Sequence, residues 1–184
     1  MSPRQVKYIF DLDGFSINKK FVCKEAAGVN IFTGQRFLRF YNVSDIPVQY
    51  EDWRGIKFVS RYIHGLKFED MNGDLDQDDL IELIEDMCRD ADHGGWLIGY
   101  KGGHVEKDLL NKLGYGHLGV NIEDFGCPKF ENLLQQYPKW MENCPLPCNR
   151  HHSVIDKKTG IIKTAHCALT ECVMFAKYIY SLTH

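Results

Sequence analysis

The sequence predicts an α/β fold with a mixed β-sheet flanked by helices, and three observations support this class. Apolar, β-rich runs come first, at residues 6–15 and twice within residues 19–43. Residues 76–91 then repeat apolar side chains at helical spacing. After them, short apolar runs bounded by glycines alternate with further helical patterns. Strands followed by alternating helices and strands are typical of a sheet that begins antiparallel and grows through helical crossovers.

Each expected element has a local reason. Gly34 permits the turn between the second and third strands. Residues 47–66 have an apolar rhythm near the helical period, and acidic residues crowd the first turn of 76–91, where the helix dipole favours them. The apolar stripe of this second helix comprises Leu80, Leu83, Ile84 and Met87. The remaining expected elements are a strand within 94–103, a helix at 104–114, a strand at 118–125, a helix at 128–137 with Pro128 at its start, an irregular segment at 138–165 and a final helix from about Ala165.

The composition indicates one globular domain over residues 1–184. Apolar residues make up 44% and charged residues 26%, which argues against a disordered or fibrous chain. The N-terminal residues lead straight into a strand-like run, without an apolar segment long enough for a signal peptide or a membrane span. The seven cysteines are odd in number and widely spaced. We therefore expect an intracellular protein, cytoplasmic or nuclear, with reduced thiols.

The acidic residues are concentrated in one segment. Residues 69–92 hold eleven of them and a single basic residue, so the rest of the chain is basic and compatible with an anionic polymer as partner. Oxygen-bearing side chains at alternate positions from Asp70 resemble a calcium loop. The turn glycine and the final glutamate of such a loop are replaced by Leu75 and Ile81. We therefore interpret the segment as a loop that caps the following helix.

Two carboxylates of the first strand are candidates for metal binding. Asp11 and Asp13 are two residues apart, so both side chains project to the same face of a strand. Paired carboxylates at such a position bind divalent cations such as Mg²⁺, although a hydrogen-bonded or solvated pair is the alternative.

The order of features along the chain resembles the DnaQ-like (DEDDh) 3′–5′ exonucleases of the ribonuclease H-like fold. In that superfamily the first strand carries Asp-x-Glu, a later strand-to-helix step carries an Asp, and the last helix begins His-x-Ala-x-x-Asp. The resemblance assigns these catalytic roles to five residues of this chain: Asp11, Asp13, Glu106, His166 and Glu171. It covers nearly the whole chain and implies a two-metal centre with Mg²⁺ or Mn²⁺, in which His166 deprotonates the attacking water.

This chain departs from the exonuclease motif at three of its four acids. Asp13, Glu106 and Glu171 each have the other carboxylate length. A methylene moves an oxygen by about 1 Å or more, and catalytic geometry tolerates little misplacement. The acids are therefore either an altered active set or remnants of one.

Thiols and imidazoles near the C-terminus form a second candidate site. Cys148-x-x-His151 has the spacing at which one loop supplies two zinc ligands, and Cys167 is a third candidate. Cys144 and His152 are rival ligands that spacing does not exclude. The alternative is a set of unrelated buried thiols and surface histidines.

The C-x-x-H pair followed by "HCAL" at the last helix resembles the Maelstrom domain of the germline small-RNA pathway, a DnaQ-like domain with a Glu-Cys-His-Cys zinc site. The resemblance implies the zinc ligands Glu25, Cys148, His151 and Cys167, in a closed, structural site. It also implies single-stranded nucleic acid, RNA more than DNA, or proteins of a small-RNA pathway as partners.

Two classes of function follow from the sequence. One is a metal-dependent nuclease, in which the four acids hold Mg²⁺ or Mn²⁺ and His166 is the base. The other is a zinc-stabilised, Maelstrom-like module that binds nucleic acid or partner proteins and in which those acids are remnants. The aromatic and basic residues 35–43 suit nucleic-acid contacts, and a hairpin strand with one buried face explains them equally well.

Overall fold

A five-stranded mixed sheet forms the centre of the protein in the computed structural model, which describes residues 1–70, 73–143, 148–165 and 167–183. The strand order is β3-β2-β1-β4-β5, with antiparallel pairing among the first three and parallel pairing from β1 to β4 and β5. The α/β prediction with a mixed sheet is confirmed. The strands are β1 (Val6–Ile17), β2 (Lys20–Asn30), β3 (Arg36–Phe40), β4 (Leu97–Tyr100) and β5 (Gly119–Asn121).

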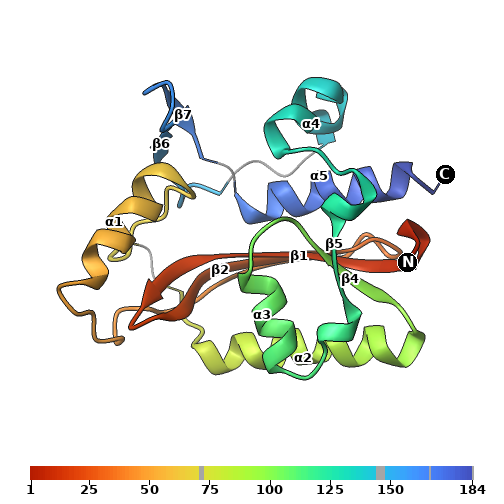
Figure 1. Ribbon diagram of the computed structural model, residues 1–184, viewed down its shortest axis with the longest axis horizontal. Helices are drawn as coiled ribbons and strands as arrows, with labels where there is room; N and C mark the ends of the chain where they lie inside the picture. The colour runs from red at the N-terminus through yellow and green to blue at the C-terminus, as the bar shows by residue number, and fades with distance from the viewer. Residues whose placement is uncertain (71–72, 144–147, 166, 184) are drawn as a thin grey trace.

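Helices cover both faces of this sheet (Figure 1). One apolar core lies between the sheet and α5, and a second lies between the sheet and α2 and α3. The α-helices are α1 (Asp52–Tyr62), α2 (Gln77–Gly94), α3 (Val105–Lys112), α4 (Phe130–Gln136) and α5 (Ala168–Ser181). The 3₁₀ turns are η1 (Pro3–Gln5), η2 (Gly116–Leu118), η3 (Ile122–Phe125) and η4 (Pro138–Asn143).

The acid-rich segment before α2 acts as a helix cap, as the capping interpretation predicted. The Asp76 side chain accepts hydrogen bonds from the backbone N–H groups of Asp78 and Asp79, at 2.8 and 3.0 Å. At the other end Gly95 adopts the left-handed conformation, with φ +67°, that commonly terminates a helix.

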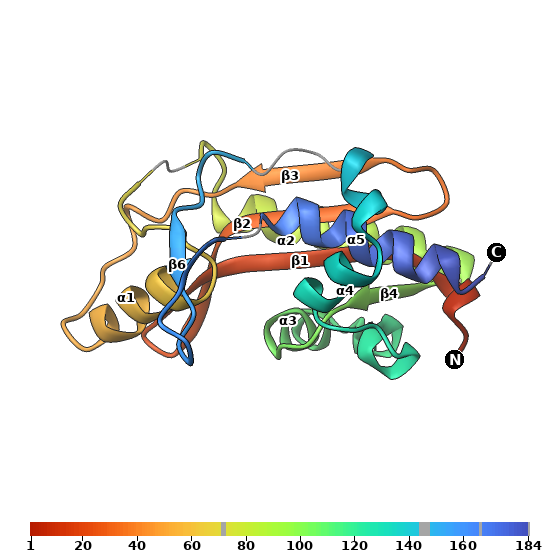
Figure 2. The same cartoon turned by 90° about the horizontal axis from the view of Figure 1, so that it is seen from above.

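Residues 138–165, predicted to be irregular, contain a β-hairpin. Its strands are β6 (Ser153–Ile155) and β7 (Ile162–Thr164), and it lies beside α1 at the end of the molecule opposite both termini (Figures 1 and 2). The strands are too short for a periodic signal, and of β6 only Val154 is fully buried. Other boundaries also differ from expectation: α1 covers only Asp52–Tyr62 of the pattern at 47–66, α5 starts at Ala168, α4 starts at Phe130, and the strand expected at 118–125 ends at Asn121.

A β-bulge sets which side chains of β1 and β2 share a face. Asp13 lies opposite Glu25, whereas the next pair is Gly14 with Cys23, so Lys24 is the extra residue. Its ammonium group is buried and donates to the carbonyl oxygen of Phe68 at 2.6 Å. Directly opposite residues of an antiparallel pair point to the same face. The bulge therefore places the carboxylates of Asp13 and Glu25 together, on the face that α5 covers.

Candidate active site and metal centre

Carboxylates from three elements gather at the middle of β1. Asp11 and Asp13 from β1 and Glu171 from the first turn of α5 line one cavity of about 280 Å³. Glu106, near the start of α3, reaches the same strand, because its Oε1 accepts a hydrogen bond of 3.1 Å from the backbone N–H of Leu12. The four acids named by the exonuclease resemblance thus lie around one point of the fold.

Burial leaves these carboxylates with strongly perturbed proton affinities. Burial, followed by the charges of neighbouring carboxylates, raises the pKa of Asp11 and of Asp13 well above the ordinary value. Burial also raises the pKa of Glu106 and of Glu171 to about 7. Mutually repelling carboxylates with little solvent are a donor set that a divalent cation would neutralise. The oxygen-only donors fit Mg²⁺ or Mn²⁺.

The rim of the cavity comes from segments far apart in the sequence. Tyr62 and Ile63 at the end of α1 line the cavity. Glu131 of α4 and Lys163 of β7 also line it and are joined by an ion pair of 2.9 Å. Sequence reasoning missed these residues, because nothing in their local patterns distinguishes them from surface positions. His166, predicted as the catalytic base, lies outside the residues that the structure describes.

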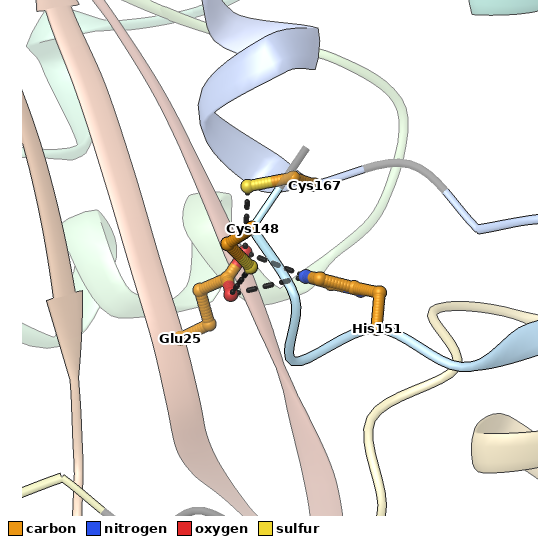
Figure 3. A group of neighbouring side chains, drawn as sticks. All are labelled: Glu25, Cys148, His151 and Cys167. Atoms are coloured by element: carbon orange, nitrogen blue, oxygen red, sulfur yellow. Dashed lines mark hydrogen bonds and ion pairs between the residues drawn. The ribbon is translucent and has the colours of Figure 1, made fainter. Parts of the chain in front are cut away.

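A second group of polar side chains lies beside the acids. Atoms of Glu25, Cys148, His151 and Cys167, one from each, all lie within 4.8 Å of one another (Figure 3). His151 Nε2 is 3.0 Å from both carboxylate oxygens of Glu25, and the two sulfurs lie 3.4 and 3.6 Å from those oxygens. Donors around a tetrahedral zinc at its usual bond lengths are separated by about 3.3–3.8 Å. The two-sulfur, one-nitrogen, one-oxygen set fits a structural zinc ion, and both sulfur–oxygen distances lie within this range.

A backbone carbonyl fixes the orientation of the His151 ring. Its Nδ1 lies 2.5 Å from the carbonyl oxygen of His64, so Nδ1–H donates there and Nε2 faces the cluster. His64 is itself buried between the N–H of Leu66 and the carbonyl of Gly14, and burial lowers its pKa to about 4. A backbone carbonyl that binds the far nitrogen of a ligating histidine is a common second contact in metal sites.

Glu25 is fully buried, although it is a charged residue of a strand. Its Oε1 also accepts a 3.0 Å hydrogen bond from the backbone N–H of Ala168, the first residue of α5. The carboxylate therefore caps α5 at the positive end of its dipole while it faces the thiols. Of the rival ligands, His152 points away and contacts Asp70 at 3.2 Å, and Cys144 lies outside the described residues.

Contacts within this group shift the pKa values of its members. A hydrogen bond from Cys148 lowers the pKa of Cys167 to about 3, and the same contact raises the pKa of Cys148. Burial alone lowers the pKa of His151, but its contacts with Cys167 and Glu25 outweigh that effect and raise it to about 11. Zinc ligation requires deprotonated thiols and a neutral imidazole, so zinc binding would release protons from Cys148 and His151, whose pKa values are raised.

Four other cysteines are free and buried: Cys23, Cys88, Cys127 and Cys172. His104 lies exposed at the N-cap of α3 and takes no part in either group. Among the described residues, no helix combines the length and apolarity needed to cross a bilayer.

Comparison with known proteins finds solved structures of similar fold. No protein-family model and no curated protein matches the chain. Solved structures of the Mopeia virus exonuclease domain do match. The form partially complexed with manganese has 19% identity and a TM-score of 0.59 over 98% of this chain and 79% of that one. The manganese-depleted form has 18% identity and a TM-score of 0.60 over the same shares.

The chain has the same fold as these exonuclease domains. The match runs over nearly the whole of this chain, and the ribonuclease H-like sheet predicted from the sequence is confirmed.

Proposed function

We infer that this chain is a zinc-stabilised DnaQ-like domain that hydrolyses single-stranded nucleic acid with divalent cations, RNA being the first substrate to test. The observation that carries this inference is the gathering of Asp11, Asp13, Glu106 and Glu171 around one point of β1, three of them lining one cavity. The presence of manganese in one of the similar exonuclease domains gives further support.

The four acids would form one cation-binding set in this proposal. Asp11 and Asp13 project side by side from β1 and would hold the cations, and Glu171 would complete the set from α5. Glu106 is held at the N–H of Leu12, which fixes its carboxylate beside the pair. Bound Mg²⁺ or Mn²⁺ supplies Lewis acidity and lowers the pKa of a water molecule. The resemblance gives His166 the role of base.

The zinc site has a structural role in the proposal. Glu25, Cys148, His151 and Cys167 supply four ligands, which leaves no open position for a substrate. They come from β2, from the segment before β6 and from the residue before α5, so a zinc ion would join these three parts. Its binding free energy would then contribute directly to folding.

A second candidate is a Maelstrom-like module that binds nucleic acid, or proteins of a small-RNA pathway, without cleaving. The carboxylate lengths at Asp13, Glu106 and Glu171 favour it, because each differs from the exonuclease motif. A displacement of about 1 Å is enough to disable a catalytic group.

One sample tests both parts of the proposal. Elemental analysis of purified protein should find about one zinc per chain, lost in Cys148→Ser. A labelled single-stranded RNA should be degraded in Mn²⁺ or Mg²⁺, and Asp11→Ala should abolish this while it retains zinc. Intact RNA with both cations would favour the silent module, and folded protein without zinc would overturn the structural site.

A further inference from the structure

Basic and aromatic side chains lie on two elements that also contribute residues to the acidic cavity. These elements are α1 and the β6–β7 hairpin, which lie side by side in both views (Figures 1 and 2). A direct contact joins the two elements, since the Lys157 ammonium lies 5.0 Å from the centre of the Phe58 ring. We call this region the α1–hairpin surface; its members are Arg54, Lys57, Phe58, Arg61, Tyr62, Lys157, Lys158 and Lys163.

The cations of α1 follow one side of the helix. Arg54, Lys57 and Arg61 are exposed and three or four residues apart, so they form a line of about 10 Å. In the part of the chain that the structure describes, none of the three forms an ion pair with an acidic side chain. The acids of α1 are confined to its start, where Asp52 accepts hydrogen bonds from the backbone of Asn18 and Gln49. The line of positive charge is therefore not neutralised by the helix itself.

Apolar and aromatic side chains lie among these cations. Phe58 is 39% exposed, and its ring centre lies 5.2 Å from that of Tyr62. Arg61 lies over the Tyr62 ring at 5.5 Å. Exposed rings interleaved with cations are the combination that binds single strands, because bases stack on the rings while phosphates meet the charges.

The surface leads into the cavity. Tyr62 belongs both to the surface and to the cavity rim, next to Ile63. On the hairpin side Lys163 lies at the rim in its ion pair with Glu131. A strand that followed α1 toward its C-terminal end would thus reach the acids past an aromatic ring. The cavity volume of about 280 Å³ is near the lower limit for small-molecule sites, so it suits the end of one strand rather than a duplex.

We propose that the α1–hairpin surface binds the single-stranded nucleic acid and guides its end into the acidic cavity. Lys57 and Arg61 contact phosphates, Tyr62 stacks on a base at the rim, and Lys163 exchanges Glu131 for a phosphate as the strand enters. This inference rests on the proposed function, since it assumes that the acidic cavity acts on nucleic acid. An anionic membrane is the competing partner, but it would leave the path into the cavity unused.

The test measures binding separately from cleavage. Fluorescence anisotropy follows a labelled oligouridylate across a series of KCl concentrations, without added Mg²⁺ or Mn²⁺ and without chelator. Each phosphate contact on a single strand contributes about 0.7 to the slope of log affinity against log salt. The double variant Lys57→Ala/Arg61→Ala should therefore reduce the slope by about 1.4. The matched control, Arg4→Ala/Lys112→Ala, removes two exposed charges elsewhere and should leave the slope unchanged.

The aromatic contact has its own test. Tyr62→Ala should weaken binding about fivefold or more at unchanged salt slope, because a base loses its stacking partner. Tyr62→Trp should bind as the parent does, which separates stacking from a folding defect. Zinc content and circular dichroism confirm that each variant is folded.

The outcomes distinguish this inference from the proposed function. Equal salt slopes in the double variant and the control would refute binding at the α1–hairpin surface, even if RNA is cleaved. A reduced slope without any cleavage in Mn²⁺ would support the surface while it refutes the nuclease. Binding to phosphatidylserine vesicles that depends on Lys57 and Arg61, without binding to the oligonucleotide, would overturn the inference in favour of a membrane.

Discussion

Replacing Glu171 by glutamine should stabilise the protein while it removes activity. The Glu171 carboxylate lines the cavity with Asp11 and Asp13, and burial raises its pKa from 4.5 to about 7. One pKa unit corresponds to about 1.4 kcal/mol, so above pH 7 its charge opposes folding by about 3 kcal/mol at most. Glutamine keeps a polar amide in the cavity, so the substitution recovers only part of this energy. We therefore expect Glu171→Gln to gain about 1–2 kcal/mol at pH 8 without Mg²⁺ or Mn²⁺.

The pH dependence follows from the same pKa. The unfolded Glu171 ionises near 4.5 and the folded one near 7, so between these values the native state binds more protons than the unfolded state. Stability of the parent protein should therefore fall as the pH rises from about 4.5 to about 7, and Glu106 contributes in the same direction. Below about pH 4.5 the advantage of Glu171→Gln should vanish, because the carboxyl is then neutral in both states.

Urea denaturation of zinc-loaded protein at several pH values measures these differences. Glu82→Gln, an exposed position of α2, is the matched control and should change stability by less than about 0.5 kcal/mol. Added Mn²⁺ should reverse the order, since only the parent retains the full set of carboxylates. A Glu171→Gln protein less stable than the parent at pH 8 without Mn²⁺ would refute the proposed electrostatic conflict among the acids.

Two further predictions concern zinc and the start of α3. Removing zinc with a chelator should lower the midpoint of thermal unfolding sharply. Zinc should also be released more readily as the pH falls, because protons compete with zinc for the thiolates. A midpoint that chelation leaves unchanged would contradict a structural zinc. Gly103→Ala should lower the free energy of unfolding by about 1–2 kcal/mol, because Gly103 has φ +50°. It should also slow cleavage, because the added Cβ would lie 3.2 Å from Oε2 of Glu106. Thermal unfolding and cleavage rates measure the two effects of Gly103→Ala. An unchanged cleavage rate would indicate that Glu106 takes no part in the reaction.

The main sheet was predictable because its signals are local. Apolar runs, the turn at Gly34 and the capped helix after Asp76 each depend on neighbouring residues. The β6–β7 hairpin was not, because three-residue strands have no measurable period. Its stability comes instead from docking against α1, a contact between distant segments. The cavity rim was not predictable for the same reason, because Tyr62 and Lys163 line one cavity only after folding.

The candidate sites show the same division between local and distant information. The two-residue spacing placed Asp11 and Asp13 on one face, and the spacing of Cys148 and His151 placed them in one loop. Glu25 is different, because its face depends on the bulge at Lys24, and a shift of one residue would turn it to the opposite side of the sheet. Only the resemblance to a known domain singled it out from the sequence.

The zinc group and the acidic cavity depend on one another through the start of α5. Glu25 lies opposite Asp13 and also accepts the N–H of Ala168, so one side chain links the strand pair to the helix. Cys167 supplies a sulfur to the group, and its carbonyl accepts the N–H of Glu171 at 3.1 Å, which forms the turn that carries this acid. A zinc ion would therefore fix the position of Glu171 relative to the β1 acids. Loss of zinc should disturb the acidic centre before it unfolds the sheet, because the apolar core between the sheet and α2 and α3 contains none of the four zinc-group residues.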